Sequence, residues 1–137
     1  MNTAAGRYLR LVAHEEAPRH FDTPDGGARR VWAIAFGLAA RRRFEPDSPL
    51  AEIRQTVTTV AVPSLEAEML VRDALGEQVP VGEIGEAVRT GVHLLLFGRL
   101  TDELALNDGE LDDLIAQAEE LADDAGISRR PEPTNAP

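Results

Sequence analysis

The sequence predicts a mainly α-helical fold, a compact bundle of about four to five helices, with one short β-strand or hairpin around residues 53–62 as an alternative for that segment. Apolar residues recur every three to four positions over most of the chain, which is typical of amphipathic helices. Clusters of Pro and Gly separate these stretches, as they do where helices end. The chain has 137 residues, 43% of them hydrophobic, which is enough for one core without disulfide or metal support.

The first third of the chain predicts a short helix and a long one. Residues 4–15 show one apolar face and precede Pro18, which ends a helix. Two Pro and a Gly pair predict a loop over residues 17–27. Residues 28–42 are apolar nearly all round in their middle, so we expect them to form the central buried helix.

The middle of the chain predicts a turn at residues 45–49, an ambiguous stretch and a further helix. Residues 53–62 are rich in β-branched side chains, which favour a strand, but polar and apolar residues do not alternate clearly. This stretch either extends a helix or pairs with a partner chain. Ser64 is expected to begin the next helix as its N-cap and Gly76 to end it. The residues expected on its apolar side are Leu65, Met69, Leu70 and Val71.

The last third predicts two long helices. The first covers residues 82–104 and contains three Gly, near one of which it can break. The second covers residues 107–125, with Asn107 and Glu110 as a capping box and Gly126 as the C-cap. The residues expected to face inward are Ile84, Val88, Val92, Leu95 and Leu96 on the first helix, and Leu111, Leu114, Ile115, Ala118, Leu121 and Ala122 on the second.

These elements predict one helical domain over residues 1–127, followed by a disordered Pro-rich tail over residues 128–137. The first 16 residues lack the apolar run of a signal peptide. The longest apolar run in the chain is too short to span a membrane. We therefore expect a cytoplasmic protein without membrane contact.

Charge is divided unevenly along the chain. Residues 1–63 contain nine Arg and seven acidic residues, whereas residues 64–137 contain five Arg and seventeen acidic residues, and Lys is absent. The net charge of −10 repels DNA at long range, so the chain is not a typical nucleic-acid binder. The acidic second half either provides solubility or meets a basic partner.

No motif in the sequence indicates a reaction, a cofactor or a metal. The absence of Cys excludes disulfides and thiolate chemistry, and the absence of Lys excludes a P-loop. His14 and His20 are six residues apart with Pro18 between them, whereas a zinc-protease motif needs two His four apart on a helix. His93 lies in an apolar run and is interpreted as a core histidine. We expect no enzymatic activity, no cofactor and no metal site.

Five arginines bracket the central helix and are the best functional candidates for contact with a partner or a phosphate: Arg29, Arg30, Arg41, Arg42 and Arg43. No acidic residue occurs between positions 28 and 43. A structural role is the alternative, because the helix dipole favours cations at a helix C-terminus. The functional interpretation is contact with phosphate or with an acidic surface of a partner.

The segment DGGARRVWAIAFGLAARRR, at residues 25–43, resembles one in small prokaryotic proteins encoded beside DNA phosphorothioation (Dnd-type) modification and restriction genes. Residues 63–75 and 114–127, the latter ending ADDAGI, fit the order of helices in that family, and the resemblance covers roughly residues 22–127. The sequence departs from the family at residues 44–62. The resemblance implies an accessory role in phage defence and transfers no catalytic residue.

Two functional hypotheses follow. In the first, the protein is a non-enzymatic accessory protein of such a defence system and docks a larger partner protein through the Arg-bracketed helix or the acidic C-terminal helix. In the second, it is a small dimeric transcriptional regulator or antitoxin-like protein, with residues 53–62 in the homodimer interface. The second hypothesis needs local DNA contact through a basic face, which the net charge disfavours.

Overall fold

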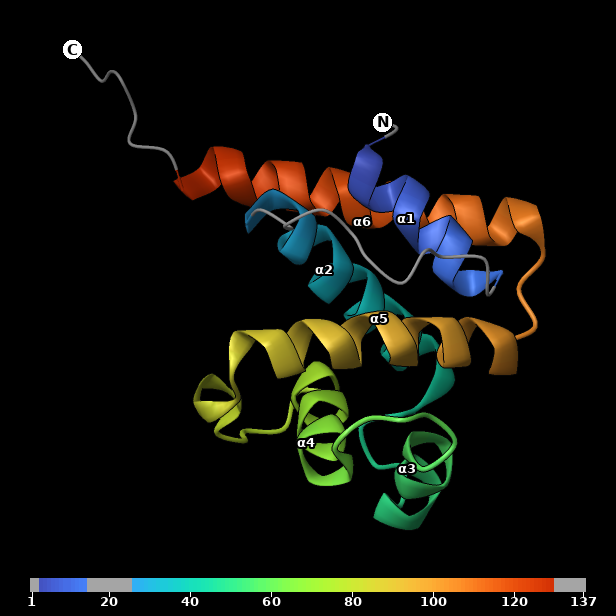
Figure 1. Cartoon of the computed structure of the whole chain (residues 1–137), viewed down its shortest axis with the longest axis vertical. Coiled ribbons are helices and arrows are strands. Elements are labelled where there is room, and N and C mark those ends of the chain that lie inside the picture. The colour runs from blue at the N-terminus through green and yellow to red at the C-terminus, as the bar shows by residue number, and fades with distance from the viewer. Residues whose placement is uncertain (1–2, 15–25, 130–137) are drawn as a thin grey trace.

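The computed structural model describes residues 3–14 and 26–129 of the chain. These residues form six α-helices, one short 3-10 helix and no β-strand, which confirms the mainly helical class with one helix more than expected (Figure 1). The helices are α1 (Ala4–Ala13), α2 (Gly26–Arg43), α3 (Leu50–Val57), α4 (Ser64–Ala74), η1 (Val81–Glu83), α5 (Glu86–Glu103) and α6 (Asp108–Arg129). Most of the loop predicted before α2 and of the predicted C-terminal tail lies outside the described residues.

Helix α2 is the central element, as its sequence predicted. It packs against α5, α6 and α1 and also contacts α4, while α3 and α4 lie at the end of the molecule away from α6 (Figure 1). Trp32 is 1% exposed and donates a hydrogen bond from Nε1 to the carbonyl oxygen of Ala5, 3.1 Å away. Ala35 and Ala39 are fully buried, and such small residues let neighbouring helices approach closely.

The ambiguous stretch at residues 53–62 is helical in its first half. Ile53, Thr56 and Val57 are buried on one face of α3, because a spacing of three to four residues places them together. The chain then turns, with backbone hydrogen bonds from residues 58–60 to carbonyls three or four positions earlier. Of the two alternatives left open for this stretch, the structure shows the helix in its first half and no strand, and Ile53, Thr56 and Val57 pack in the chain's own core.

Several predicted helix ends differ in detail from the structure. The N-cap of α4 is Pro63 and no side chain caps this helix, so the predicted capping role of Ser64 is wrong. Gly76 follows α4 with a φ of 97°, which confirms the predicted glycine stop. The helix predicted over residues 82–104 divides into η1 and α5, with extended backbone at Ile84 and Gly85 between them.

Helix α6 confirms the predicted capping box. The backbone nitrogen of Glu110 donates to Asn107 Oδ1 at 2.8 Å, and the backbone nitrogen of Asn107 donates to Glu110 Oε1 at 3.0 Å. The predicted C-cap at Gly126 is wrong, because the helix continues to Arg129 and so includes two residues assigned to the tail. Glycine permits the left-handed conformation that ends a helix but does not impose it.

A buried carboxylate joins the two ends of the chain. Glu119 on α6 is 1% exposed, and its Oε2 accepts hydrogen bonds from the backbone nitrogen and the hydroxyl of Thr3, at 2.7 and 2.6 Å. Thr3 is also the N-cap of α1, since its hydroxyl accepts a bond from the backbone nitrogen of Gly6. A side chain at Gly6 would collide with the Glu119 carboxylate. Glu119 thus supplies the negative charge that the first turn of α1 lacks.

Candidate functional site

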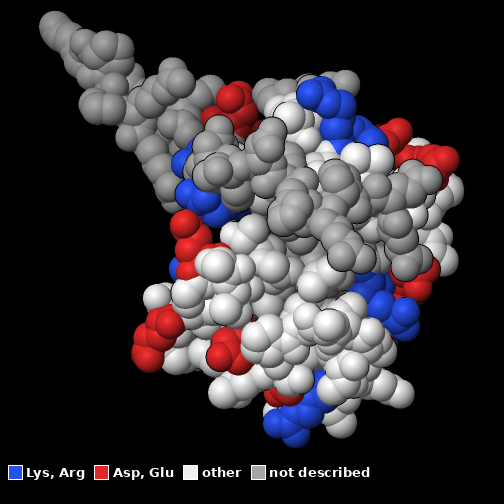
Figure 2. Space-filling model, viewed as in Figure 1, with Lys and Arg blue, Asp and Glu red and all other residues white. Residues whose placement is uncertain are grey.

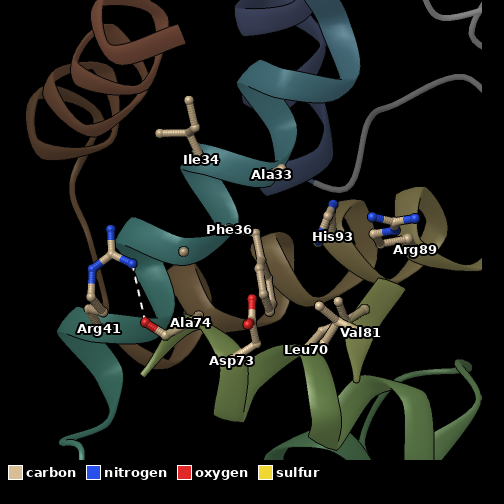
Figure 3. Close-up of a pocket in the computed structure, with 11 residues that line it drawn as sticks. Ala33, Ile34, Phe36, Arg41, Leu70, Asp73, Ala74, Val81, Arg89 and His93 are labelled. Carbon is tan, nitrogen blue, oxygen red and sulfur yellow. Dashed lines mark hydrogen bonds between the residues drawn. The ribbon is translucent and has the colours of Figure 1, made fainter. Parts of the chain in front are cut away.

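Three of the five predicted arginines line one cleft between α2 and α5. Two adjoining hollows of about 380 and 350 Å³ share Ala33, Arg89 and His93 and together form this cleft. We call it the arginine cleft and define it by the residues Arg29, Arg30, Ala33, Phe36, Arg41, Asp73, Glu86, Arg89 and His93. In Figure 3, Phe36 lies between Arg41 on one side and His93 with Arg89 on the other.

Arg89 is the most constrained of the cleft arginines. Its Nη2 donates to the carbonyl oxygen of Ile84 at 3.1 Å, at the extended junction before α5. Its Nε is buried and has no hydrogen-bond partner among the described residues. A buried donor without an acceptor lowers stability by about 1–3 kcal/mol. The guanidinium is therefore held in place by one bond, with a second donor unused.

His93 forms part of the cleft floor and is uncharged at neutral pH. It is 8% exposed, and its ring lies 5.0 Å from that of Phe36 between centroids, with a tilt of 34°. Burial, assisted by the positive charge of Arg89, lowers the pKa of His93 from its ordinary 6.5 to about 4. Its burial confirms the prediction of a core histidine, although it also borders the cleft.

The three predicted arginines of the cleft have different partners. Arg29 Nε lies 3.3 Å from Glu86 Oε1, in the first turn of α5. Arg41 Nη1 donates to the carbonyl oxygen of Ala74, 3.2 Å away at the end of α4 (Figure 3). Arg30 forms no ion pair or hydrogen bond with any described residue and remains available for an anion.

The other two predicted arginines lie outside the cleft. Arg42 is exposed and has no ion pair among the described residues. Arg43 has a structural environment instead, because its Nε donates to Glu103 Oε1 at 2.8 Å and its Nη1 lies 3.2 Å from Glu52 Oε1. Its guanidinium carbon also lies 4.7 Å from the centre of the Phe44 ring.

Glu103 is the centre of a network at the C-terminal end of α2. Besides Arg43, it accepts bonds from Thr56 Oγ1 at 2.8 Å and from Arg99 Nε at 2.9 Å. Burial alone would raise the pKa of Glu103, but the hydrogen bonds from Thr56, Arg43 and Arg99 outweigh it and lower the pKa. The hydrogen bond with Glu103 likewise raises the pKa of Arg43. This network joins α2, α3 and α5.

A second hollow lies between α4, η1 and the start of α5. It has a volume of about 270 Å³, and we call it the leucine groove: Leu65, Glu66, Met69, Pro80, Glu83, Ile84, Gly85 and Val88. The side chains of Leu65 and Val88 were expected to face the core, but they are 66% and 37% exposed. Ile84 is buried at the groove's base. The groove thus combines apolar side chains with the carboxylates of Glu66 and Glu83, and polar and apolar atoms contribute about equally to its surface.

Three other side chains depart from their expected burial. Leu11 on α1, Leu95 on α5 and Leu121 on α6 are 37%, 47% and 41% exposed. The remaining inward positions predicted on α5 and α6 are buried, as expected. Charged atoms on the visible face form separate small groups with uncharged surface between them (Figure 2). The described part of that face therefore carries no continuous basic surface.

Arg89, Glu103 and Glu119 were not predicted from sequence patterns. Each occupies an ordinary polar position on a helix, and no local signal distinguishes it from a solvated residue. The isolated Arg89 at the start of a long apolar helix was the only available indication. These residues acquire their roles from segments distant in the sequence, such as Thr56 for Glu103 and Thr3 for Glu119.

The described residues contain neither a metal-binding cluster nor a membrane-spanning helix. No group of three His, Asp or Glu side chains is placed to hold a metal ion. No helix combines the length and apolar character needed to cross a membrane. Comparison with protein-family models, with curated proteins and with solved structures found no match to this chain.

Proposed function

We propose that this chain is a non-enzymatic accessory protein of a prokaryotic DNA modification–restriction system, of the phosphorothioation-linked phage-defence kind, and that it docks a larger partner protein. The defence context comes from the resemblance of residues 25–43, 63–75 and 114–127 to proteins of such systems. The observation that carries the docking role is the leucine groove, where Leu65 leaves two thirds of its surface exposed.

The leucine groove has the chemistry of a surface that receives an amphipathic helix. Leu65 and Met69 come from one turn of α4 and face Val88 on α5 across a hollow with an apolar base. Apolar side chains of a partner helix at a spacing of three to four residues fill such a groove. Burying them removes apolar surface from water, which drives association.

The acidic residues of the leucine groove indicate the charge of the partner helix. Glu66 and Glu83 line the groove, and residues 64–137 have a net charge of −12. We therefore propose a partner helix with basic residues beside its apolar face, because complementary charges speed association and reject other partners. Arg42, exposed and unpaired among the described residues, provides a separate contact for an acidic group on the partner.

The test is co-expression of the tagged chain with the modification and restriction proteins of such a system from one host. We expect one of these proteins to co-purify at a defined stoichiometry, and Leu65→Glu combined with Val88→Glu to abolish the complex. Leu95→Glu is the matched control, because Leu95 is 47% exposed on α5 but does not line the groove. It introduces the same charge and is expected to leave the complex intact.

Two outcomes would overturn the proposal. A complex that survives the Leu65→Glu, Val88→Glu double variant excludes the leucine groove as the docking surface. A chain that binds none of these proteins, elutes as a homodimer and binds DNA with a steep salt dependence is a small transcriptional regulator or antitoxin-like protein instead.

A further inference from the structure

The arginine cleft contains more positive charge than its own side chains neutralise. Arg29, Arg30, Arg41 and Arg89 line it, whereas among the described residues only Asp73 and Glu86 supply carboxylates. His93 adds no charge at neutral pH. The cleft is therefore positive in a chain whose net charge is −10, and an anion is the ligand that such a site favours.

Two guanidinium groups at one end of the cleft have no carboxylate partner among the described residues. Arg89 Nε is buried without an acceptor among the described residues, and the whole guanidinium is oriented by its bond to the carbonyl of Ile84. Arg30 lies in the same hollow and forms no ion pair or hydrogen bond with any described residue. Both guanidinium groups line the same hollow, and an anion bound there displaces no carboxylate of a described residue from either of them.

The floor of the rest of the cleft is aromatic and apolar, with Phe36 and His93 only 2% and 8% exposed. Phe36 and His93 lie side by side with ring centroids 5.0 Å apart, next to Ala33. Arg41 closes the opposite end and is held against Ala74 (Figure 3). A side chain at Gly37 would approach Arg41 Nη1 to 3.2 Å, so a glycine here leaves Arg41 room to lie across the helix.

From this arrangement we propose that the arginine cleft binds a small phosphate ester, with the phosphate at Arg89 and Arg30 and the organic part across Phe36 and His93. A phosphate dianion accepts more hydrogen bonds than a carboxylate and so suits two guanidinium groups better. A small ligand is favoured over nucleic acid, because the net negative charge of the chain repels a polyanion at long range. A hollow of about 380 Å³ lies within the range of small-molecule sites.

The test uses phenyl phosphate as the probe, with inorganic phosphate and benzoate for comparison, measured by titration calorimetry on the full chain. We expect phenyl phosphate to bind about tenfold more tightly than either, because only it uses both the guanidinium groups and the ring surface. NMR signals of the His93 ring are expected to shift with phenyl phosphate and not with benzoate.

Two variants locate the phosphate. Arg89→Gln and Arg30→Gln are each expected to weaken phenyl phosphate binding about tenfold, as loss of a charge-assisted bond does. Arg30 forms no hydrogen bond or ion pair with any described residue, so its variant keeps the test valid even if Arg89→Gln fails to fold. Arg10→Gln is the charge-matched control, because Arg10 pairs with Asp112 away from the cleft.

Three results would overturn the proposal. These are the absence of phenyl phosphate binding at millimolar concentration, equal binding of benzoate, and unchanged affinity in Arg30→Gln. A short single-stranded DNA without a terminal phosphate distinguishes the source of the phosphate. If it displaces phenyl phosphate and binds more tightly, the ligand is a nucleic-acid backbone and the assignment to a small ester fails. The cleft and the leucine groove are separate surfaces, so each proposal can fail alone.

Discussion

The two ends of helix α2 carry the same residue type in opposite circumstances. At its C-terminal end Arg43 meets two carboxylates, and Glu103 accepts bonds from three different side chains. Near its N-terminal end the arginine cleft includes Arg30 without a partner among the described residues and Arg89 with a buried donor unused. The comparison teaches that an arginine's role depends on where the acidic residues of other segments lie.

The difference has an energetic meaning. A satisfied network holds elements together, whereas an unsatisfied buried charge lowers stability and is retained where it serves another purpose. We therefore expect the protein to lose stability when a residue of the Glu103 network is replaced. Replacing an arginine of the cleft should not lower its stability. Three experiments test this contrast, beginning with the largest expected effect.

We expect the protein to become less stable at acid pH because His93, in the arginine cleft, is buried uncharged. Its folded pKa of about 4 lies below the ordinary 6.5, so between these values the unfolded chain binds more protons. The contribution of neutral His93 to the unfolding free energy is fully present above pH 6.5. It decreases as the pH is lowered and is lost below about pH 4. The loss amounts to about 3 kcal/mol in the unfolding free energy, at about 1.4 kcal/mol per pKa unit.

Urea unfolding of the wild type and of His93→Phe at several pH values measures this effect. The variant keeps a ring in the same place and should lose much less stability between pH 6.5 and 4.5. This window also separates His93 from Glu103. Because the folded pKa of Glu103 is lowered, its contribution is present above the ordinary value of 4.5 and is lost only as the pH falls further. Parallel curves for the two proteins would contradict the assignment.

Removing the charge of Glu103 should weaken the network end. Glu103→Gln leaves Arg43 and Arg99 without their shared carboxylate, and we expect a loss of about 2 kcal/mol, below the range for fully buried pairs because the Glu103 side chain is 15% exposed. Thermal or urea unfolding at neutral pH measures it. Asp102→Asn is the control, since Asp102 is 72% exposed and should change stability by less than about 0.5 kcal/mol. Equal effects of the two changes would show that Glu103 stabilises the fold no more than an exposed carboxylate does.

Removing the charge of Arg89 should have the opposite sign. Arg89→Met deletes the unsatisfied buried donor and keeps an apolar chain of similar length, so we expect stability to rise by about 1 kcal/mol. The pKa of His93 should rise at the same time, because the nearby positive charge that lowers it is gone. NMR titration of His93 and urea unfolding measure the two effects. Arg30→Gln, in the same hollow, is the control and should leave stability unchanged. If Arg89→Met loses as much stability as Glu103→Gln, the two ends of α2 do not differ as proposed.

Much of the fold follows from local patterns. The nearly all-round apolar middle of residues 28–42 predicted the buried central helix, and Asn107 with Glu110 predicted the start of α6 from their spacing alone. Gly76 ends α4 because glycine adopts a positive φ without strain. Each of these features involves residues within a few positions of one another, so it can be predicted from the local sequence.

The stretch at residues 53–62 shows where local reasoning fails. β-branched residues favour strands on average, but Ile53, Thr56 and Val57 gain more by packing on one face of α3, and no neighbouring strand is present among the described residues. The prediction for Leu65 was also wrong. Its helical spacing predicted burial, but the arrangement of α4 beside η1 leaves it exposed.

The sequence by itself determined the helical class, the central helix and most of the apolar positions, because these depend on the period of the α-helix and on backbone conformation. The tertiary structure decided which charged residues are bound and which are available. Glu119 meets Thr3 from 116 positions away, and Glu103 meets Thr56 from 47 positions away. Hydrogen bonds and burial depend on atoms brought together in space, and no local pattern records them.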